Sequence, residues 1–150
     1  MMPLLRHILG PTRDDVMSAV EEVLRKRNWA VQHEPIVGTV RPDIVARDPG
    51  GATFVINVNQ GGWNANLGAV AQVETFRNAV ASEVGTEAKG VLVVAGEASE
   101  HLDGLAASAG VEIVRAGSGD IGSVRESLTR AGVLGESAAS QPTTQRINGA

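Results

Sequence analysis

Apolar residues recur with a helical period near the start of the chain. Their spacing of three and four residues is that of one helix face: Val16, Ala19, Val20, Val23 and Leu24. Thr12, followed three residues later by Asp15, resembles a helix N-cap. This pattern predicts a first helix over residues 13–27.

Three short segments rich in β-branched residues follow, and Gly or Pro bounds each of them. They read WAVQHEPIV, TVRPDIVARD and ATFVINVN, at residues 29–37, 39–48 and 52–59. Each of these patterns predicts a strand. The loop Pro49-Gly50-Gly51 between the last two is typical of a three-residue hairpin connection, in which Gly51 can adopt a left-handed conformation.

The second half alternates between helical and buried-strand patterns. Apolar residues step by three or four from Leu67 to Val84, which predicts a helix over residues 66–84. GVLVVAG and VEIVRAG then predict buried strands on either side of a short helix, EHLDGLAASAG, that ends at Gly110. Such a unit is expected to be right-handed with parallel strands. A last helix is expected over residues 120–131.

The predicted fold class is α/β, of the α+β kind with one mixed sheet. The order α-β-β-β-α-β-α-β joins an antiparallel half to a parallel half, with helices on both faces. A chain of 150 residues with 43% hydrophobic content can bury one core. We therefore expect a single domain over residues 1–135. The apolar-poor segment at 136–150 is expected to be a flexible C-terminal tail.

Composition and charge exclude several kinds of site. The absence of cysteine removes disulfides, thiolate nucleophiles and cysteine-based zinc sites, and the three histidines are too scattered to predict a metal site. No apolar run approaches the ~18 residues of a membrane span, and the amino terminus does not resemble a signal peptide. We therefore expect a cytoplasmic protein with no membrane partner. The net charge of −4 argues against general attraction to phosphate backbones, so any nucleic-acid contact would be local.

Polar side chains gather at the open end of the predicted hairpin. If Asp48 pairs with Ala52 across the loop, Asp43 lies opposite Asn57. Because side chains alternate along a strand, Asp43, Asn57 and Asn59 then share one face. Oxygen-bearing side chains in such a cluster suit a magnesium ion, which can activate water for phosphodiester cleavage.

The segments RPDIV and INVN, together with the order of elements, resemble the PD-(D/E)xK nuclease superfamily, which has the restriction-endonuclease-like fold. The resemblance covers residues 12–116, and Pro42 and Asp43 match the first motif. It implies that Asp43 and an acidic residue of the second motif bind the metal, while a lysine two positions later assists the attacking water. In this chain Asn57 stands in place of the acid and Asn59 in place of the lysine.

A further element of one branch of the superfamily, Q-x-x-x-Y, is resembled by AQVETF. Gln72 matches it, and Phe76 replaces the tyrosine. Glu21 or Glu22 on the first predicted helix corresponds to the extra carboxylate that some members carry.

The resemblance implies a weakened site. The implied catalytic set is Asp43, Asn57, Asn59 and Gln72, and the implied cofactor is magnesium, held by Asp43 and Asn57. An amide brings no negative charge to the ion, and without a cation at 59 nothing assists deprotonation of the water. Other polar residues that could approach are poor bases or neutral: Arg41, Arg47, Gln60 and Arg77. We expect little or no turnover. Natural loss of catalysis and deliberate inactivation both remain open as its origin.

Two hypotheses from different classes follow. The first is a nuclease-lineage protein of nucleic-acid metabolism or defence, catalytically impaired, with DNA rather than RNA as partner. The alternative is a noncatalytic interaction module that forms a homodimer or joins a larger effector, which the acidic balance favours. A nucleotide-binding role for VLVVAGEAS lacks the glycine motifs of a phosphate loop. Trp63, in the loop GGWNANLG, is the candidate for an exposed aromatic side chain.

Overall fold

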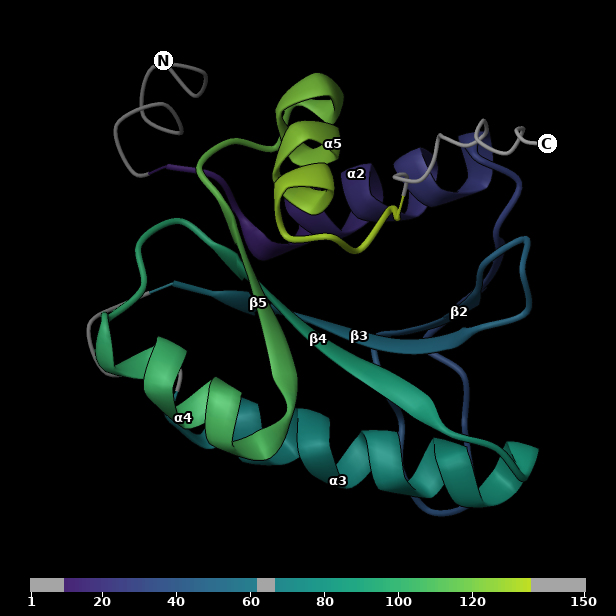
Figure 1. The fold of residues 1–150 in the computed structure, drawn as a ribbon. Coiled ribbons are helices and arrows are strands. Elements are labelled where there is room, and N and C mark those ends of the chain that lie inside the picture. Colours follow the sequence, from purple (N-terminus) through teal and green to yellow (C-terminus); the bar gives the residue numbers. More distant parts are fainter. Residues whose placement is uncertain (1–9, 62–66, 136–150) are drawn as a thin grey trace, which may run out of the picture.

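The computed structural model describes residues 10–61 and 67–135 (Figure 1). The predictions for the amino terminus, for Trp63 and for a tail at 136–150 lie outside the described residues. None of the described helices has the length and apolar character that a membrane crossing requires. The elements, in chain order, are α2 (Arg13–Lys26), β1 (Ala30–His33), β2 (Ile44–Arg47), β3 (Thr53–Gln60), α3 (Leu67–Val84), β4 (Ala88–Ala95), α4 (His101–Ala109), β5 (Val111–Ala116) and α5 (Ile121–Arg130).

One mixed five-stranded sheet forms the middle layer, and its strand order β1-β2-β3-β4-β5 is the order along the chain. The first three strands are antiparallel neighbours, whereas β3, β4 and β5 run parallel. Helices α2 and α5 cover one face of the sheet, and α3 and α4 cover the other (Figure 1). The predicted α+β class, the element order and the helices on both faces are confirmed, with α5 as the expected last helix.

Strand β3 is central and separates two apolar layers. Ile56 and Val58 face α2, where they join a core that includes Leu24. Val55 faces α3 and packs with Val80. These five side chains are at most 1% exposed, and full burial of each contributes ~1.5–3 kcal/mol to the free energy of folding. Both faces of β3 are thus fixed by packing, which holds the end of the strand in place.

The first two strands are shorter than their patterns predict. β1 ends well before residue 37, and β2 begins well after residue 39. Pro35 and Pro42 lie between them, and proline has no N–H to donate to a ladder. Val37 and Val40 consequently make only an isolated bridge. The segment between β1 and β2 is therefore a loop, which brings the chain back to the start of β2.

The hairpin between β2 and β3 has the predicted register. Ile44 lies opposite Ile56, and the N–H of Asp48 donates to the carbonyl of Ala52 at 2.9 Å. Gly51 has a φ of 97°, in the left-handed region that glycine adopts without a Cβ clash. The register therefore places Asp43, directly before Ile44, beside Asn57, directly after Ile56.

Candidate functional site

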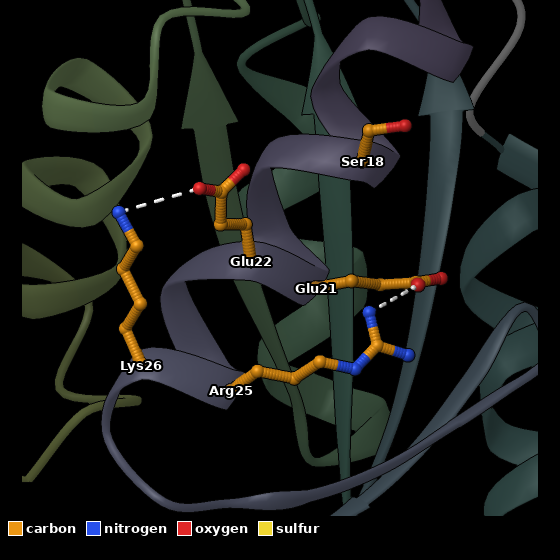
Figure 2. A pocket seen from close by; sticks show the side chains of 5 residues that line it. All are labelled: Ser18, Glu21, Glu22, Arg25 and Lys26. Carbon is orange, nitrogen blue, oxygen red and sulfur yellow. Dashed lines mark hydrogen bonds and ion pairs between the residues drawn. The ribbon is translucent and has the colours of Figure 1, made fainter.

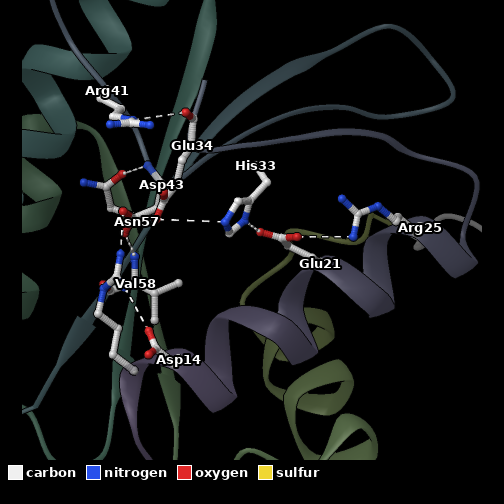
Figure 3. A network of polar contacts seen from close by, with 10 residues as sticks. Asp14, Glu21, Arg25, His33, Glu34, Arg41, Asp43, Asn57 and Val58 are labelled. Atoms are coloured by element: carbon white, nitrogen blue, oxygen red, sulfur yellow. Dashed lines mark hydrogen bonds and ion pairs between the residues drawn. The ribbon is translucent and has the colours of Figure 1, made fainter. Parts of the chain in front are cut away.

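The candidate site lies where β3 runs past the start of β2. β2 begins at Ile44, whereas β3 continues to Gln60, so the end of β3 extends beyond its antiparallel partner. The N–H of Val58 donates to Oδ2 of Asp43 at 2.8 Å (Figure 3), and the carbonyl of Val58 accepts from Nε of Arg13 at 2.9 Å. Two side chains thus satisfy backbone groups that a longer β2 would pair.

The Asp43 carboxylate is largely enclosed, and both of its oxygens are engaged. Its side chain is 17% exposed, and Oδ1 lies 2.6 Å from Nη2 of Arg13. Oδ2 accepts the N–H of Val58. A short hydrogen bond between two ionised groups is about twice as strong as one between neutral groups. Asp43 is therefore already neutralised by a cation of its own chain.

Asn57 lies beside Asp43, as the predicted register requires. The residue is 6% exposed, and its Oδ1 accepts from the backbone N–H of Asp43 at 3.0 Å (Figure 3). Its Nδ2 donates to Oε1 of Gln72 at 3.4 Å, at the long end of the hydrogen-bond range. The buried amide is thus satisfied on both sides, and it links the β2 start to helix α3.

Asn59 is half-buried near the end of β3, two residues beyond Asn57 and so on the same face of the strand. Gln72 is exposed on α3 and reaches the site through its contact with Asn57. Phe76, one turn further along α3, packs against the apolar cluster that includes Val55. The structure thus brings Asp43, Asn57 and Gln72 into one hydrogen-bonded group, whereas Phe76 belongs to the core.

The three arginines considered as substitutes for the lysine make their contacts elsewhere. Arg41 donates to the carbonyl of Glu34. Arg77 donates to the carbonyl of Gly110, at the C-terminal end of α4. Arg47 is exposed at the opposite end of β2. None of these arginine contacts involves the candidate site. The fourth candidate, Gln60, lies beside it, because its Oε1 accepts the backbone N–H of Arg13 at 2.8 Å.

The two glutamates considered as extra carboxylates lie further along α2. Glu21 is buried, accepts from Arg25 at 3.2 Å and lies 2.5 Å from Nδ1 of His33. Glu22 pairs with Lys26 on the exposed side of the helix. The hydrogen bond and the negative charge of Glu21 raise the pKa of His33 above its ordinary value. The structure therefore gives Glu21 a partner on β1 and gives neither glutamate a contact with Asp43.

Two hollows on the described surface lie away from Asp43. One, of about 460 Å³, runs along α2 between the ion pairs of that helix (Figure 2). Its lining residues are Ser18, Glu21, Glu22, Arg25 and Lys26. The other, of about 440 Å³, lies near Phe54 and Lys89 at the far end of the sheet. Asp43, Asn57, Asn59 and Gln72 line neither hollow.

Arg13 also belongs to this hydrogen-bonded group, and the sequence pattern did not predict it. It is the first residue of α2, directly after the N-cap Thr12. The positive end of a helix dipole disfavours a cation there, so an arginine at this position was the available signal that it serves a specific partner. The partner itself, Asp43, is distant in sequence and could not be read from local pattern.

The donor set at this site does not fit a magnesium ion. Among the described residues no group of three or more His, Asp or Glu side chains is placed to hold a metal. Asp43 supplies one carboxylate whose oxygens contact Arg13 and Val58, and the Oδ1 of Asn57 accepts the N–H of Asp43. Magnesium takes oxygen ligands and prefers carboxylates. This group has one carboxylate, that of Asp43, and Arg13 already neutralises its charge.

No protein-family model matches the chain, and no curated protein does. Among solved structures it is similar to EndoMS in complex with double-stranded DNA, with 18% identity and a TM-score of 0.53 over 67% of this chain and 44% of that one. It is also similar to a repair endonuclease from Pyrococcus abyssi, with 17% identity and a TM-score of 0.52 over 64% of this chain and 44% of that one. The chain thus spans less than half the length of either structure. The arrangement of its sheet and helices is that of the restriction-endonuclease-like fold.

Proposed function

We propose that this chain is a nuclease-fold protein of nucleic-acid metabolism or defence whose hydrolytic centre is catalytically impaired. The observation that carries the proposal is the contact of Asp43 with Asn57 at the end of β3, at 3.0 Å. It joins a residue matching the first nuclease motif to the position of the second. The fold similarity to EndoMS and to a repair endonuclease supports the same lineage.

The impairment follows from the charges at the site. Asn57 replaces a carboxylate with a neutral amide, which weakens attraction for a divalent cation. Asn59 replaces a lysine, so the developing charge on a phosphate has no ammonium group to stabilise it, and loss of one such contact costs ~10²–10³ in rate. Asp43, Asn57, Asn59 and Gln72 are therefore proposed as remnants of a catalytic set, with magnesium binding weak or lost.

DNA is the proposed partner. EndoMS, a structural neighbour, is seen in complex with double-stranded DNA. The net charge of −4 requires that the contact be local rather than spread over the whole surface. We place this activity in a single cytoplasmic domain over residues 1–135.

The test restores the motif and measures both binding and cleavage. Wild-type protein and a variant carrying Asn57→Glu and Asn59→Lys, with Arg13→Ala added to release the Asp43 carboxylate, are incubated with labelled duplex DNA, single-stranded DNA and RNA, with magnesium and with EDTA. The proposal expects DNA retention by the wild type without cutting. It also expects magnesium-dependent cutting by the variant, lost again when Asp43→Ala is added. A folded variant that neither binds nor cuts any of the three polymers would count against the lineage.

A noncatalytic interaction module remains the second candidate, and the exposed edge of the sheet favours it. β1 is an edge strand whose residues Ala30, Gln32 and His33 are exposed, and Ile36 in the following loop is 73% exposed. An open strand edge beside an apolar side chain is a surface on which a second copy or a larger effector can add. Light scattering across a concentration series distinguishes the two: a dimer that retains no DNA supports this candidate.

A further inference from the structure

The shortest polar contact of the candidate site comes from α2, which covers the face of the sheet opposite α3. Arg13 begins α2, and its guanidinium makes two contacts: Nη2 lies 2.6 Å from Oδ1 of Asp43, directly before β2, and Nε donates to the carbonyl of Val58 on β3 at 2.9 Å. The backbone N–H of Arg13 also donates to Oε1 of Gln60 at 2.8 Å. Gln60 in turn donates to the carbonyl of Pro11 at 2.9 Å. The start of α2 is therefore bound to β3 through both its backbone and its side chain.

We infer that the guanidinium of Arg13 takes the place of the metal cation in this nuclease-like site, and that the site serves as a metal-independent clasp joining α2 to the β2–β3 hairpin. The inference rests on the proposed function for the position where a cation would stand. A guanidinium supplies a permanent positive charge and several fixed donors. At this site those donors meet a carboxylate and a carbonyl, the kinds of oxygen that a metal would otherwise bind.

With Arg13 in the position of the metal cation, Asp43 has a structural role and not a catalytic one. A catalytic carboxylate is commonly held at some cost to stability, so its removal is often neutral or favourable. Asp43 instead satisfies the N–H of Val58 and the charge of Arg13. Its removal would leave an enclosed donor and a cation without their acceptor, which is destabilising. The direction of the stability change on removal of the Asp43 carboxylate therefore distinguishes a structural clasp from a catalytic site.

Asp14 provides a matched control. Its Oδ1 lies 3.2 Å from Nη1 of the same guanidinium, but its side chain is 90% exposed, against 17% for Asp43. Exposed ion pairs contribute little to stability because solvent screens them. Two aspartates that contact one arginine thus differ in enclosure, and the clasp assigns the stability effect to Asp43.

The experiment measures the melting temperature of the purified chain in EDTA by circular dichroism. Asp43→Ala is expected to lower it by about 5 °C or more, whereas Asp14→Ala should change it by less than about 2 °C. Arg13→Ala combined with Asp43→Ala should lower it by clearly less than the sum of the two single changes, since the residues are coupled. If Asp43→Ala is too unstable to purify, Asp43→Asn replaces it in the same comparison, with a smaller loss expected. An unchanged or raised melting temperature for a folded Asp43 variant would overturn the inference.

A metal titration supplies the second measurement. Excess magnesium chloride should leave the melting temperature of the wild type and of Asn57→Glu unchanged, because Arg13 holds the position. Arg13→Ala with Asn57→Glu should gain several degrees from magnesium, by mass action on a site that binds it in the folded state. A magnesium-dependent rise in the melting temperature of the wild type would show that the ion displaces Arg13, and would overturn the inference of a clasp. DNA takes no part in either measurement, so failure here is distinct from failure of the proposed function.

Discussion

Strand β3 buries two polar side chains on the face that packs against α3, and the two differ in their hydrogen bonding. Thr53, at the start of the strand, is 4% exposed, and its Oγ1 has no hydrogen-bond partner among the described residues. Asn57, towards the other end, is 6% exposed and is bonded to both Asp43 and Gln72. At equal burial, one polar group belongs to a network and the other does not.

The difference teaches that burial alone does not identify a functional residue. A hydroxyl without a partner costs free energy, and a β-branched residue such as threonine fits a strand on shape alone. The amide of Asn57 instead contacts Asp43, directly before β2, and Gln72 on α3. Within one strand, the satisfied polar group therefore marks the candidate site, and the unsatisfied one marks a position where the core tolerates a local loss.

The largest change in stability is expected when the hydrogen-bonded amide of Asn57 is removed. Asn57→Leu keeps the side-chain size but leaves the enclosed N–H of Asp43 without an acceptor. Loss of a buried hydrogen-bond partner of this kind costs about 2 kcal/mol. Urea unfolding followed by circular dichroism should show this loss in the free energy of unfolding. Equal stability of the variant and the wild type would show that the amide is dispensable.

A smaller effect, of opposite sign, is expected at the other end. Thr53→Val replaces the unpartnered hydroxyl with a methyl group of similar size. Removing the cost of the buried hydroxyl should raise the free energy of unfolding by about 1 kcal/mol. The same urea titration measures it, with the exposed Thr39→Val as the matched control, for which little change is expected. A loss of stability at Thr53 would mean that its hydroxyl has a role that burial and contacts do not reveal.

The smallest change in stability is expected from pH. It affects the titratable contact between Glu21 and His33 but not the hydrogen bonds of the Asn57 amide. Glu21 raises the pKa of His33 in the folded protein. The stabilisation is therefore fully present below the unfolded pKa of about 6.5 and is lost as pH rises through the higher folded pKa. Since the His33 side chain is 54% exposed, the melting temperature of the wild type should exceed that of His33→Gln by about 1–2 °C near pH 6 and by less at pH 9. The cost of Asn57→Leu should stay constant over the same pH range.

Local pattern predicted most of the architecture. The apolar period of three and four residues located α2 and α3, and the β-branched runs located the strands, because each element shows its buried face in its own sequence. Strands β1 and β2 were predicted too long. Pro35 and Pro42 interrupt their pairing, and a pattern of β-branched residues does not show this. The loop at Gly51 and the alternation of side chains together fixed the hairpin register.

The sequence by itself determined that Asp43 meets Asn57, because a short loop and a period of two leave one register for a hairpin. It could not determine what neutralises Asp43. That depends on where α2 packs across the sheet, and on a flexible side chain reaching from its first residue to the end of β3. Such a contact between residues distant in the chain is decided by the packing of whole elements, so Arg13 entered the site only with the tertiary structure.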